Sequence, residues 1–459
     1  MELGKAKAIV SKIAKEKCID VQSTWDMFFF DEILLRLSKS KYCKSFIIKG
    51  GLYLQNIVGV ETRGTMDIDF KYIGSKYTND DLKIIFSEIC SNDENDNIYF
   101  RVVSVDDIIT ETKYGGKTIR IEASFYNVRK RFGIDIAIGD VVTPNPIKYD
   151  HKLLFKNEEC KLFAYTIETI IAEKFETLIS KGMQNSRSKD LFDLYLLNKE
   201  KYDVNILNDA MVNTFYSRKT KYDKIEMLNT LNDVFSFDRP KELYENYAKK
   251  NKFVKDVSFE MCKLSILNIF THLKFENKIY LSDYNIELHL VRHGESDKNI
   301  VGGWSDSHLT ENGKQEVVTL LTQLEKYDVF VSSDLPRAME TSNIINTKLN
   351  MDIIFNDNFR EANNGIFKNK TINEFLEHKN FRYSCLKMNE NYPSGESPTE
   401  FYLRVKDAFF KMLENNKNKK IILVTHGGVI TVILCLLNGY QYSNKLQIMP
   451  HTGSILKLK

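Results

Sequence analysis

The segment from Ile286 to Ser296 constrains the fold of this 459-residue chain more than any other. Its sequence, IELHLVRHGES, begins with alternating and then continuous apolar residues, which is the pattern of a buried β-strand. A cation, an imidazole and a flexible residue follow directly, at Arg292-His293-Gly294. Ligands of open α/β sheets bind at the carboxyl ends of the strands. The segment therefore predicts phosphoryl transfer, in which Arg292 holds phosphate oxygens and His293 attacks.

Three later segments place further polar residues after predicted strands. Ser332-Ser333-Asp334-Leu335-Pro336-Arg337 ends one strand and begins a helix, with Pro336 near the first helical position. Glu361 follows a strand at 353–355, and His426 follows a strand at 421–424. Helices alternate with these strands, so we expect a mostly parallel, three-layer α/β domain. The predicted sheet edge brings together Arg292, His293, Arg337, Glu361 and His426.

These motifs, with Gly302-Gly303-Trp304-Ser305-Asp306 and Leu309-Thr310-Glu311-Asn312-Gly313, resemble the histidine phosphatase (phosphoglycerate-mutase-like) superfamily from Ile286 onward. The resemblance implies a phosphohistidine at His293, stabilised by Arg292, Arg337 and His426, with Glu361 as general acid and base and no cofactor. It also implies that Asn299 lies beside the phosphate. A phosphatase is favoured because the predicted domain is compact and lacks long insertions over the pocket. A phosphoglycerate-mutase-type phosphotransferase remains the alternative.

A second group of motifs lies in the first half of the chain. The strand Phe46–Ile48 leads into Gly50-Gly51, where the backbone can approach a phosphate closely. Asp67 and Asp69 lie two residues apart in RGTMDIDF, so they face the same side of a strand. Asp135 occupies the same kind of position in FGIDIAI. Three carboxylates on neighbouring strands predict a two-metal site for nucleotidyl transfer.

The order FIIKGGLYL, RGTMDIDF, GIDIAIGD, IAEKFETL and RSKDLFDLY resembles the AbiEii/AbiGii-type nucleotidyltransferases, many of which are bacterial toxins or phage-defence factors. The resemblance implies a mixed sheet with a helical C-lobe, and Mg²⁺ or Mn²⁺ held by Asp67, Asp69 and Asp135. The nucleotide-binding residues that it implies are Gly50, Gly51, Arg63, Lys174 and Asp190. Lys174 also interrupts an apolar helical stripe, where reaching a triphosphate is favoured over extending along the helix edge to solvent.

Length and composition agree with this organisation. A chain of 459 residues exceeds a single typical core, and we predict a nucleotidyltransferase domain over residues 1–283 and a phosphatase domain over residues 284–459. The first domain is expected to have its sheet at about 23–150 and its helical lobe at about 160–283. Seven widely spaced cysteines without a CxxC pair indicate reduced thiols in a cytoplasm. No apolar run reaches the length of a membrane span.

The predicted function is bifunctional. The first domain is expected to transfer a nucleotide from a nucleoside triphosphate to an acceptor hydroxyl, and the second to hydrolyse a phosphomonoester. The toxin resemblance suggests a tRNA 3′ end as acceptor and a cognate antitoxin protein as a partner, while a small molecule or a protein hydroxyl stays open. One alternative is a monofunctional phosphatase with a nucleotide-binding, non-catalytic N-terminal module. The two domains could be fused because they act in the same pathway, or only because fusion ensures their co-expression, and both explanations stay open.

Overall fold

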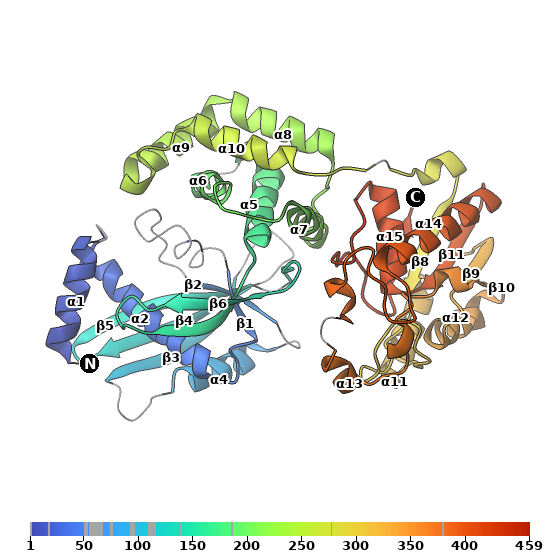
Figure 1. Ribbon diagram of the computed structural model, residues 1–459, viewed down its shortest axis with the longest axis horizontal. Coiled ribbons are helices and arrows are strands. Elements are labelled where there is room, and N and C mark those ends of the chain that lie inside the picture. The colour runs from blue at the N-terminus through green and yellow to red at the C-terminus, as the bar shows by residue number, and fades with distance from the viewer. Residues whose placement is uncertain are drawn as a thin grey trace. The chain divides into compact units, whose positions relative to one another are not determined.

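The computed structural model describes residues 2–16, 19–49, 54, 68–73, 77–91, 97–108, 116–137, 139–184, 187–276, 278–378 and 381–459. Contacts between residues divide the chain into two compact units, Met1–Leu273 and Lys274–Lys459 (Figure 1). Each unit has a β-sheet of its own, so each has an independent framework for a site.

A mixed sheet forms the centre of the first unit, in the strand order β3-β4-β5-β2-β1-β7-β6. Its strands are β1 (Phe46–Ile48), β2 (Ile68–Tyr72), β3 (Ile98–Ile108), β4 (Gly116–Phe125), β5 (Val128–Ala137), β6 (Ile147–Lys152) and β7 (Glu159–Ala164). The β1–β7 and β2–β5 pairs are parallel, and the other described pairs of this sheet are antiparallel. The parallel β2–β5 register sets Asp69 directly opposite Asp135.

The alternation of side chains along each strand gives this sheet an apolar face and a polar face. On β4, Ile119, Ile121, Ala123 and Phe125 are buried and lie on one face. Thr118, directly before Ile119, faces the opposite side of the strand and is paired in register with Asp135. Asp135 and its neighbour Asp69 therefore belong to the polar face, away from the apolar core.

Helices α1 (Leu3–Glu16) and α2 (Val21–Lys39) cover the apolar face. Trp25, Phe28 and Phe29 of α2 pack against Ile98 and Phe125 of the sheet. Each fully buried side chain of this size contributes on the order of 1.5–3 kcal/mol relative to leaving it exposed. The remaining α-helices among the described residues of the unit are α4 (Asn79–Ile89) and a helical lobe of α5 (Ile167–Lys181), α6 (Ser188–Leu197), α7 (Val204–Ser217), α8 (Lys224–Ser236), α9 (Asp238–Lys250) and α10 (Phe259–Thr271) (Figure 1). The predicted mixed sheet with a helical lobe is confirmed.

The second unit contains a five-stranded sheet in the order β10-β9-β11-β8-β12. Its strands are β8 (Glu287–Arg292), β9 (Val329–Ser332), β10 (Ile353–Phe355), β11 (Lys420–Thr425) and β12 (Ile455–Leu458). All described neighbours in this sheet are parallel except β12, which pairs antiparallel with β8 at one edge. The mostly parallel sheet predicted from the sequence is confirmed.

Helices cover both faces of this second sheet. Its helices are α11 (Glu311–Leu320), α12 (Pro336–Leu349), α13 (Ile372–Leu376), α14 (Pro398–Asn415) and α15 (Gly427–Asn438). On one face, Val317 of α11 and Ile345 of α12 pack with Val291, Phe330 and Ile422 of the strands. Helices α14 and α15 pack together, and α15 contacts β8 from the other face (Figure 1). The result is the predicted three-layer arrangement.

The segment 274–283 belongs to the second unit, upstream of the boundary predicted at residues 283 and 284. The backbone N–H of Glu276 donates to the carbonyl oxygen of Gly439, and that of Ile279 donates to Leu436. These bonds attach the segment to the end of α15. No described helix combines the length and the apolar character that a membrane span needs.

Candidate active sites

His293 lies at the carboxyl end of β8 with its ring almost fully buried. Its Nδ1 lies 2.7 Å from the carbonyl oxygen of Gly294, and its Nε2 lies 3.2 Å from Nε of Arg337. A carbonyl oxygen only accepts and a guanidinium only donates, so Nδ1 carries the proton and Nε2 presents its lone pair. Burial, with a further contribution from Arg337, lowers the pKa of His293 to about 3. The ring is therefore a neutral nucleophile near pH 7.

Arg337 sits in the first turn of α12 and is 3% exposed. Its NH2 donates to the carbonyl oxygen of Gly303 at 2.8 Å, and its NH1 donates to that of Ser305 at 3.2 Å. Gly303 has φ +78°, a conformation that favours glycine, so the GGWSD segment turns its carbonyls toward the guanidinium. Burial lowers the pKa of Arg337 to about 10, which leaves it protonated near neutral pH.

His426 follows the neighbouring parallel strand β11 and is fully buried. The register pairs Thr425 with Arg292, so the residues after the two strands lie side by side. The rings of His293 and His426 have centroids 5.1 Å apart. His426 Nε2 is hydrogen-bonded to the Ser333 hydroxyl at 2.8 Å. Burial, with Arg337 adding to the effect, lowers the pKa of His426 well below its usual range.

Glu361 reaches the same place from the loop after β10. Its Oε2 accepts from the backbone N–H of Gly428 at 3.0 Å, and its Oε1 accepts from Ala362 at 3.1 Å. A Cβ atom on Gly428 would lie 2.2 Å from Glu361 Oε1, so only glycine permits this approach. The first turn of α15 thus holds the carboxylate against the site.

Positive groups outnumber negative ones where these residues meet. Arg292 and Arg337 are both guanidinium ions, and Glu361 is the one carboxylate that acts electrostatically on both. Among the described residues, two buried nitrogen atoms at this point have no hydrogen-bond partner, Arg292 Nε and His426 Nδ1. Buried polar atoms are normally paired, and orphaned ones require an explanation. An anion bound beside His293 would pair them and balance the charge.

A cavity of about 370 Å³ opens beside these residues. Arg292, Glu361 and the first two residues of α15 form part of its wall. The rest comes mainly from the segment between β10 and α14 and from the loop after α15, including Phe375, Tyr383, Tyr392, Tyr442 and Met449. The sequence reasoning expected no long insertion over the pocket. Phe375, Arg382, Tyr383 and Tyr392, between β10 and α14, supply one side of the wall.

The structure brings together Arg292, His293, Arg337, Glu361 and His426, as predicted. Asn299 is exposed and does not line the cavity; its backbone N–H is held by the Asp297 carboxylate. The acceptors that orient Arg337, at Gly303 and Ser305, and the hydroxyl of Ser333 were not assigned roles from the sequence. All lie in the quoted motifs, but nothing in those motifs indicates a hydrogen bond to a particular side chain.

In the first unit, Asp69 and Asp135 are paired in register on β2 and β5. Both are partly buried, and the Thr118 hydroxyl donates to Asp135 Oδ1 at 2.6 Å. Oxygen ligands held close together are the donor set that Mg²⁺ or Mn²⁺ prefers, so the arrangement fits a divalent cation. Asp67, Gly50, Gly51 and Arg63 lie outside the residues that the structure describes.

Lys174 of α5 is joined to α6 by two ion pairs. Its Nζ lies 2.8 Å from Asp190 Oδ1 and 2.6 Å from Asp193 Oδ2. All three side chains are largely buried. The predicted pair of Lys174 and Asp190 is therefore adjacent, with the lysine bound to two carboxylates.

A buried charge network that the sequence reasoning did not identify lies near the end of β1. Lys49 pairs with Asp140 and lies 3.3 Å from Glu173, while Arg218 lies 3.3 Å from both acids and 2.8 Å from Glu176. Burial opposes ionisation of Asp140, but Lys49 and Arg218 hold its pKa well below the usual range. For Glu173 burial prevails and raises the pKa. These five residues come from four segments far apart in the sequence, so no local motif reveals the network.

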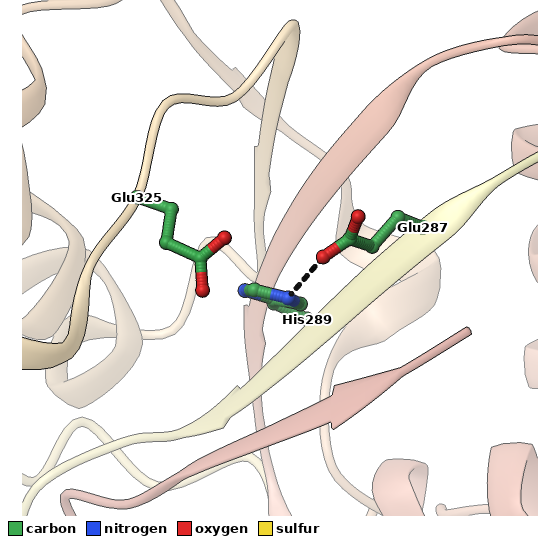
Figure 2. A group of neighbouring side chains, drawn as sticks. All are labelled: Glu287, His289 and Glu325. Atoms are coloured by element: carbon green, nitrogen blue, oxygen red, sulfur yellow. Dashed lines mark hydrogen bonds and ion pairs between the residues drawn. The ribbon is translucent and has the colours of Figure 1, made fainter.

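A group of potential metal ligands lies at the amino end of β8, where Figure 2 shows His289 between the carboxylates of Glu287 and Glu325. His289 is bonded to Glu287 at 3.1 Å and to the Tyr327 hydroxyl at 2.7 Å. Lys420 pairs with both carboxylates, and Lys457 pairs with Glu325. These lysines already neutralise the acids, so we interpret the group as a structural charge network.

Comparison with known proteins agrees with this division. The family model described as "Nucleotidyl transferase AbiEii toxin, Type IV TA system" matches residues 32–261. The model of the histidine phosphatase superfamily (branch 1) matches residues 288–459. The chain belongs to both families. Its N-terminal part is an AbiEii nucleotidyltransferase domain and its C-terminal part a histidine phosphatase domain, as the motifs predicted.

The phosphatase domain also resembles individual proteins. "Probable phosphoglycerate mutase GpmB" of Escherichia coli is 30% identical over 162 residues, which cover 34% of this chain and 75% of that protein. The alpha-ribazole phosphatase of Shigella flexneri is 21% identical, with a TM-score of 0.35 over 38% of this chain and 90% of that one. A phosphoglycerate mutase of Thermus thermophilus is 28% identical, with a TM-score of 0.28 over 38% and 92%. At these scores the two structures add nothing to the assignment.

Proposed function

We propose that the chain is a bifunctional enzyme, and that its phosphatase domain hydrolyses a phosphomonoester through a phosphohistidine. Nε2 of His293 attacks the phosphorus atom, forming a P–N bond as the bond to the leaving oxygen breaks. The developing charge spreads over the phosphoryl oxygens, which Arg292, Arg337 and His426 Nδ1 are placed to stabilise. The Ser333 hydroxyl can donate to His426 Nε2 and so leave the proton of that ring on Nδ1.

Glu361 is the proposed general acid and then general base. It gives its proton to the leaving oxygen in the first step. In the second step it takes a proton from water, whose oxygen attacks phosphorus and breaks the P–N bond. The products are the alcohol, inorganic phosphate and free His293. The reaction as proposed needs no cofactor.

The observation that carries this proposal is the surplus of buried positive groups around a neutral histidine whose Nε2 presents its lone pair. The test is to incubate the full-length protein with a ³²P-labelled phosphomonoester in excess EDTA. We expect release of phosphate and an acid-labile, base-stable label on the protein. Activity in His293→Ala equal to that of the wild type contradicts the assignment.

For the nucleotidyltransferase domain we propose transfer of a nucleotide from a nucleoside triphosphate to an acceptor hydroxyl, with release of pyrophosphate. Asp69 and Asp135, with Asp67, would hold Mg²⁺ or Mn²⁺, which when bound supplies charge neutralisation at the triphosphate. Asp135 is positioned by Thr118 to accept the proton of the attacking hydroxyl. Gly50, Gly51, Arg63, Lys174 and Asp190 remain the proposed nucleotide-binding residues. The resemblance to toxin relatives suggests a tRNA 3′ end as acceptor, and the description of the matched family as a toxin of a toxin–antitoxin system is consistent with a cognate antitoxin protein as partner.

The acceptor can be identified with labelled substrates. The full-length protein is incubated with each α-³²P nucleoside triphosphate and total cellular RNA, with and without Mg²⁺, and the label is followed by gel electrophoresis. We expect Mg²⁺-dependent labelling of a discrete RNA. Nucleotide binding without pyrophosphate release would favour the alternative of a non-catalytic nucleotide-binding module.

A mutase is the second candidate for the phosphatase domain, because a relative carries that name. A mutase returns the phosphoryl group from His293 to the substrate, whereas a phosphatase gives it to water. Incubation with 3-phosphoglycerate separates them, since free phosphate indicates hydrolysis and 2-phosphoglycerate indicates transfer.

A further inference from the structure

The cavity that Arg292 and Glu361 help to line bears on the kind of leaving group that the phosphatase domain accepts. The phosphoryl group requires the cations at the strand ends, but most residues of the cavity wall come from other segments of the chain. Four aromatic rings line it, from Phe375, Tyr383, Tyr392 and Tyr442, together with the thioether of Met449. This wall is therefore built from flat apolar surfaces.

The polar groups on the wall are largely satisfied within the protein. The hydroxyls of Tyr383 and Tyr442 are bonded to each other at 2.8 Å. The Asn444 side-chain amide donates to the carbonyl oxygen of Leu386 at 3.0 Å and also to that of Tyr383. The Asn364 amide donates to the carbonyl of Gly302 at 2.8 Å. These groups are thus engaged in holding the wall together.

Charge on the lining is equally limited. Of the lining residues, Arg292, Glu361 and Arg382 are charged, and the first two are assigned to the chemistry. Arg382 is exposed, so solvent and salt weaken its attraction for a distant anion. A small acidic leaving group such as a glycerate would find one screened cation. A flat ring would find the apolar, aromatic side of the wall to lie against.

The rings are held rigidly in place. Tyr383 stacks on Tyr392 with centroids 6.2 Å apart and planes 19° apart, and Tyr442 stacks on Tyr402 at 5.0 Å and 11°. The rings of Phe375, which lines the cavity, and Phe367, which does not, have centroids 5.0 Å apart and belong to one core cluster with Tyr392. Such a preorganised wall loses little side-chain entropy when a ligand binds.

We propose that the phosphatase site selects phosphomonoesters whose leaving group carries a flat aromatic ring, which lies against the wall of Tyr383, Tyr392, Tyr442 and Met449. The inference rests on the proposed phosphatase function. The ring can belong to a nucleobase, reached through a ribose, or to a phenyl group. A nucleobase would give both domains of this chain substrates of one chemical class. Both sources are separate arms of the test.

The test compares kcat/KM of the full-length protein for pairs that differ only in the ring. One pair is adenosine 5′-monophosphate and ribose 5-phosphate, and the other is 2-phenylethyl phosphate and ethyl phosphate. Stacking of a base on aromatic side chains predicts a preference of about 10-fold or more for the ring-bearing member. Preference in the first pair alone identifies a nucleobase. Preference in the second alone identifies a phenyl group, and ratios near one in both overturn the proposal.

Variants tie the preference to the wall. Tyr392→Leu is expected to lower the ratio toward one, whereas Tyr392→Phe keeps the ring and the ratio. Tyr392 is buried, so Met449→Gln, at a residue 36% exposed, serves as a second variant that should fold. Phe355→Leu removes an exposed ring from β10 outside the lining and should leave the ratio unchanged. A ratio that survives both wall variants overturns the assignment.

Binding to His293→Gln keeps this test separate from the test of catalysis. This variant cannot form a phosphohistidine, so calorimetry reports affinity without turnover. We expect adenosine 5′-monophosphate to bind more tightly than ribose 5-phosphate by about the same factor. Equal affinities overturn the inference even if the wild type hydrolyses phosphomonoesters. If the wild type hydrolyses neither ester while His293→Gln retains the difference in affinity, the phosphatase function alone is contradicted.

Discussion

The two units of this chain place opposite charges at the ends of their strands. In the phosphatase domain, Arg292, Arg337, His293 and His426 surround a point where an anion balances the charge. In the nucleotidyltransferase domain, Asp69 and Asp135 are paired on parallel strands, an arrangement that favours a cation. Under the proposed functions, a phosphate ester would be stabilised directly in the first case and through a metal in the second. The comparison illustrates that side chains of opposite charge can each be suited to a phosphate ester.

The buried charged side chains of the two units also differ in what holds them in place. The phosphatase residues are held by backbone groups of neighbouring loops, such as the carbonyls of Gly303 and Ser305 around Arg337. The charges near β1 are held mainly by one another, in the network of Lys49, Asp140, Glu173 and Arg218. Removing one member of such a network leaves unpaired charge.

The largest expected effect separates the two activities. His293→Gln should lower phosphomonoester hydrolysis by about 10⁴-fold or more, because it removes the nucleophile of the reaction. Nucleotide transfer should stay at the wild-type rate, since the change lies in a different compact unit. Release of phosphate and of pyrophosphate is measured on the same preparation. A parallel fall of both would show that the units depend on each other.

Asp69→Asn makes the opposite separation. We expect nucleotide transfer to fall by about 10²–10³-fold, because the amide is a weaker ligand and carries no charge. Hydrolysis should be unchanged. Asp106→Asn is the matched control, on β3 of the same sheet, where the carboxylate pairs with Arg120 and is 46% exposed. Wild-type transfer by Asp69→Asn would contradict the metal site.

Arg218→Met tests the charge network. The substitution leaves three carboxylates with one fewer cation and should destabilise the first unit by about 3 kcal/mol or more. Arg101→Met is the control, because Arg101 pairs with Glu122 on the surface with 72% of its side chain exposed. That change should cost well under about 1 kcal/mol. Trp25 reports unfolding of this unit in urea when Trp304 is replaced by Phe.

As the pH falls, the phosphatase domain should begin to lose stability at a higher pH than the first unit does. The pKa of His293 is about 3 in the folded state, against about 6.5 when unfolded, so only the unfolded state binds a proton between these values. Stability is therefore fully present above about pH 6.5 and falls as pH decreases toward 3, by up to about 1.4 kcal/mol per pH unit. Asp140 in the other unit has a lowered pKa and loses its contribution below its usual value of 3.8.

The order of acid unfolding can be followed with the two tryptophans, one in each unit. Trp25→Phe leaves Trp304 as the reporter of the phosphatase domain, and urea titrations are repeated from pH 7 to pH 4.5. His293→Gln should make the dependence of its free energy of unfolding on pH shallower, leaving the part due to His426, whose pKa burial also lowers. An equally steep dependence in that variant would show that His293 does not cause it.

The smallest expected effect concerns Asn299. Its exposed position outside the cavity predicts that Asn299→Ala changes kcat/KM for phosphomonoesters by no more than about twofold. A much larger loss of kcat/KM, measured by steady-state kinetics, would indicate that Asn299 lies beside the phosphate, as the family resemblance implied.

The sequence alone determined the two families, the order of the strands that carry the chemistry, and the five residues that converge on the phosphatase site. It did so because the end of a strand can be recognised from consecutive residues: a buried apolar run followed by Arg-His-Gly indicates both the strand and the point where it ends. Only the tertiary structure decided which nitrogen of His293 carries the proton, since Gly294 and Arg337 approach the ring from different segments. It also decided the aromatic wall, the network around Arg218 and the exposure of Asn299. The aromatic wall, the network around Arg218 and the contact of Arg337 with His293 depend on residues far apart in the chain, whose distances no local pattern records.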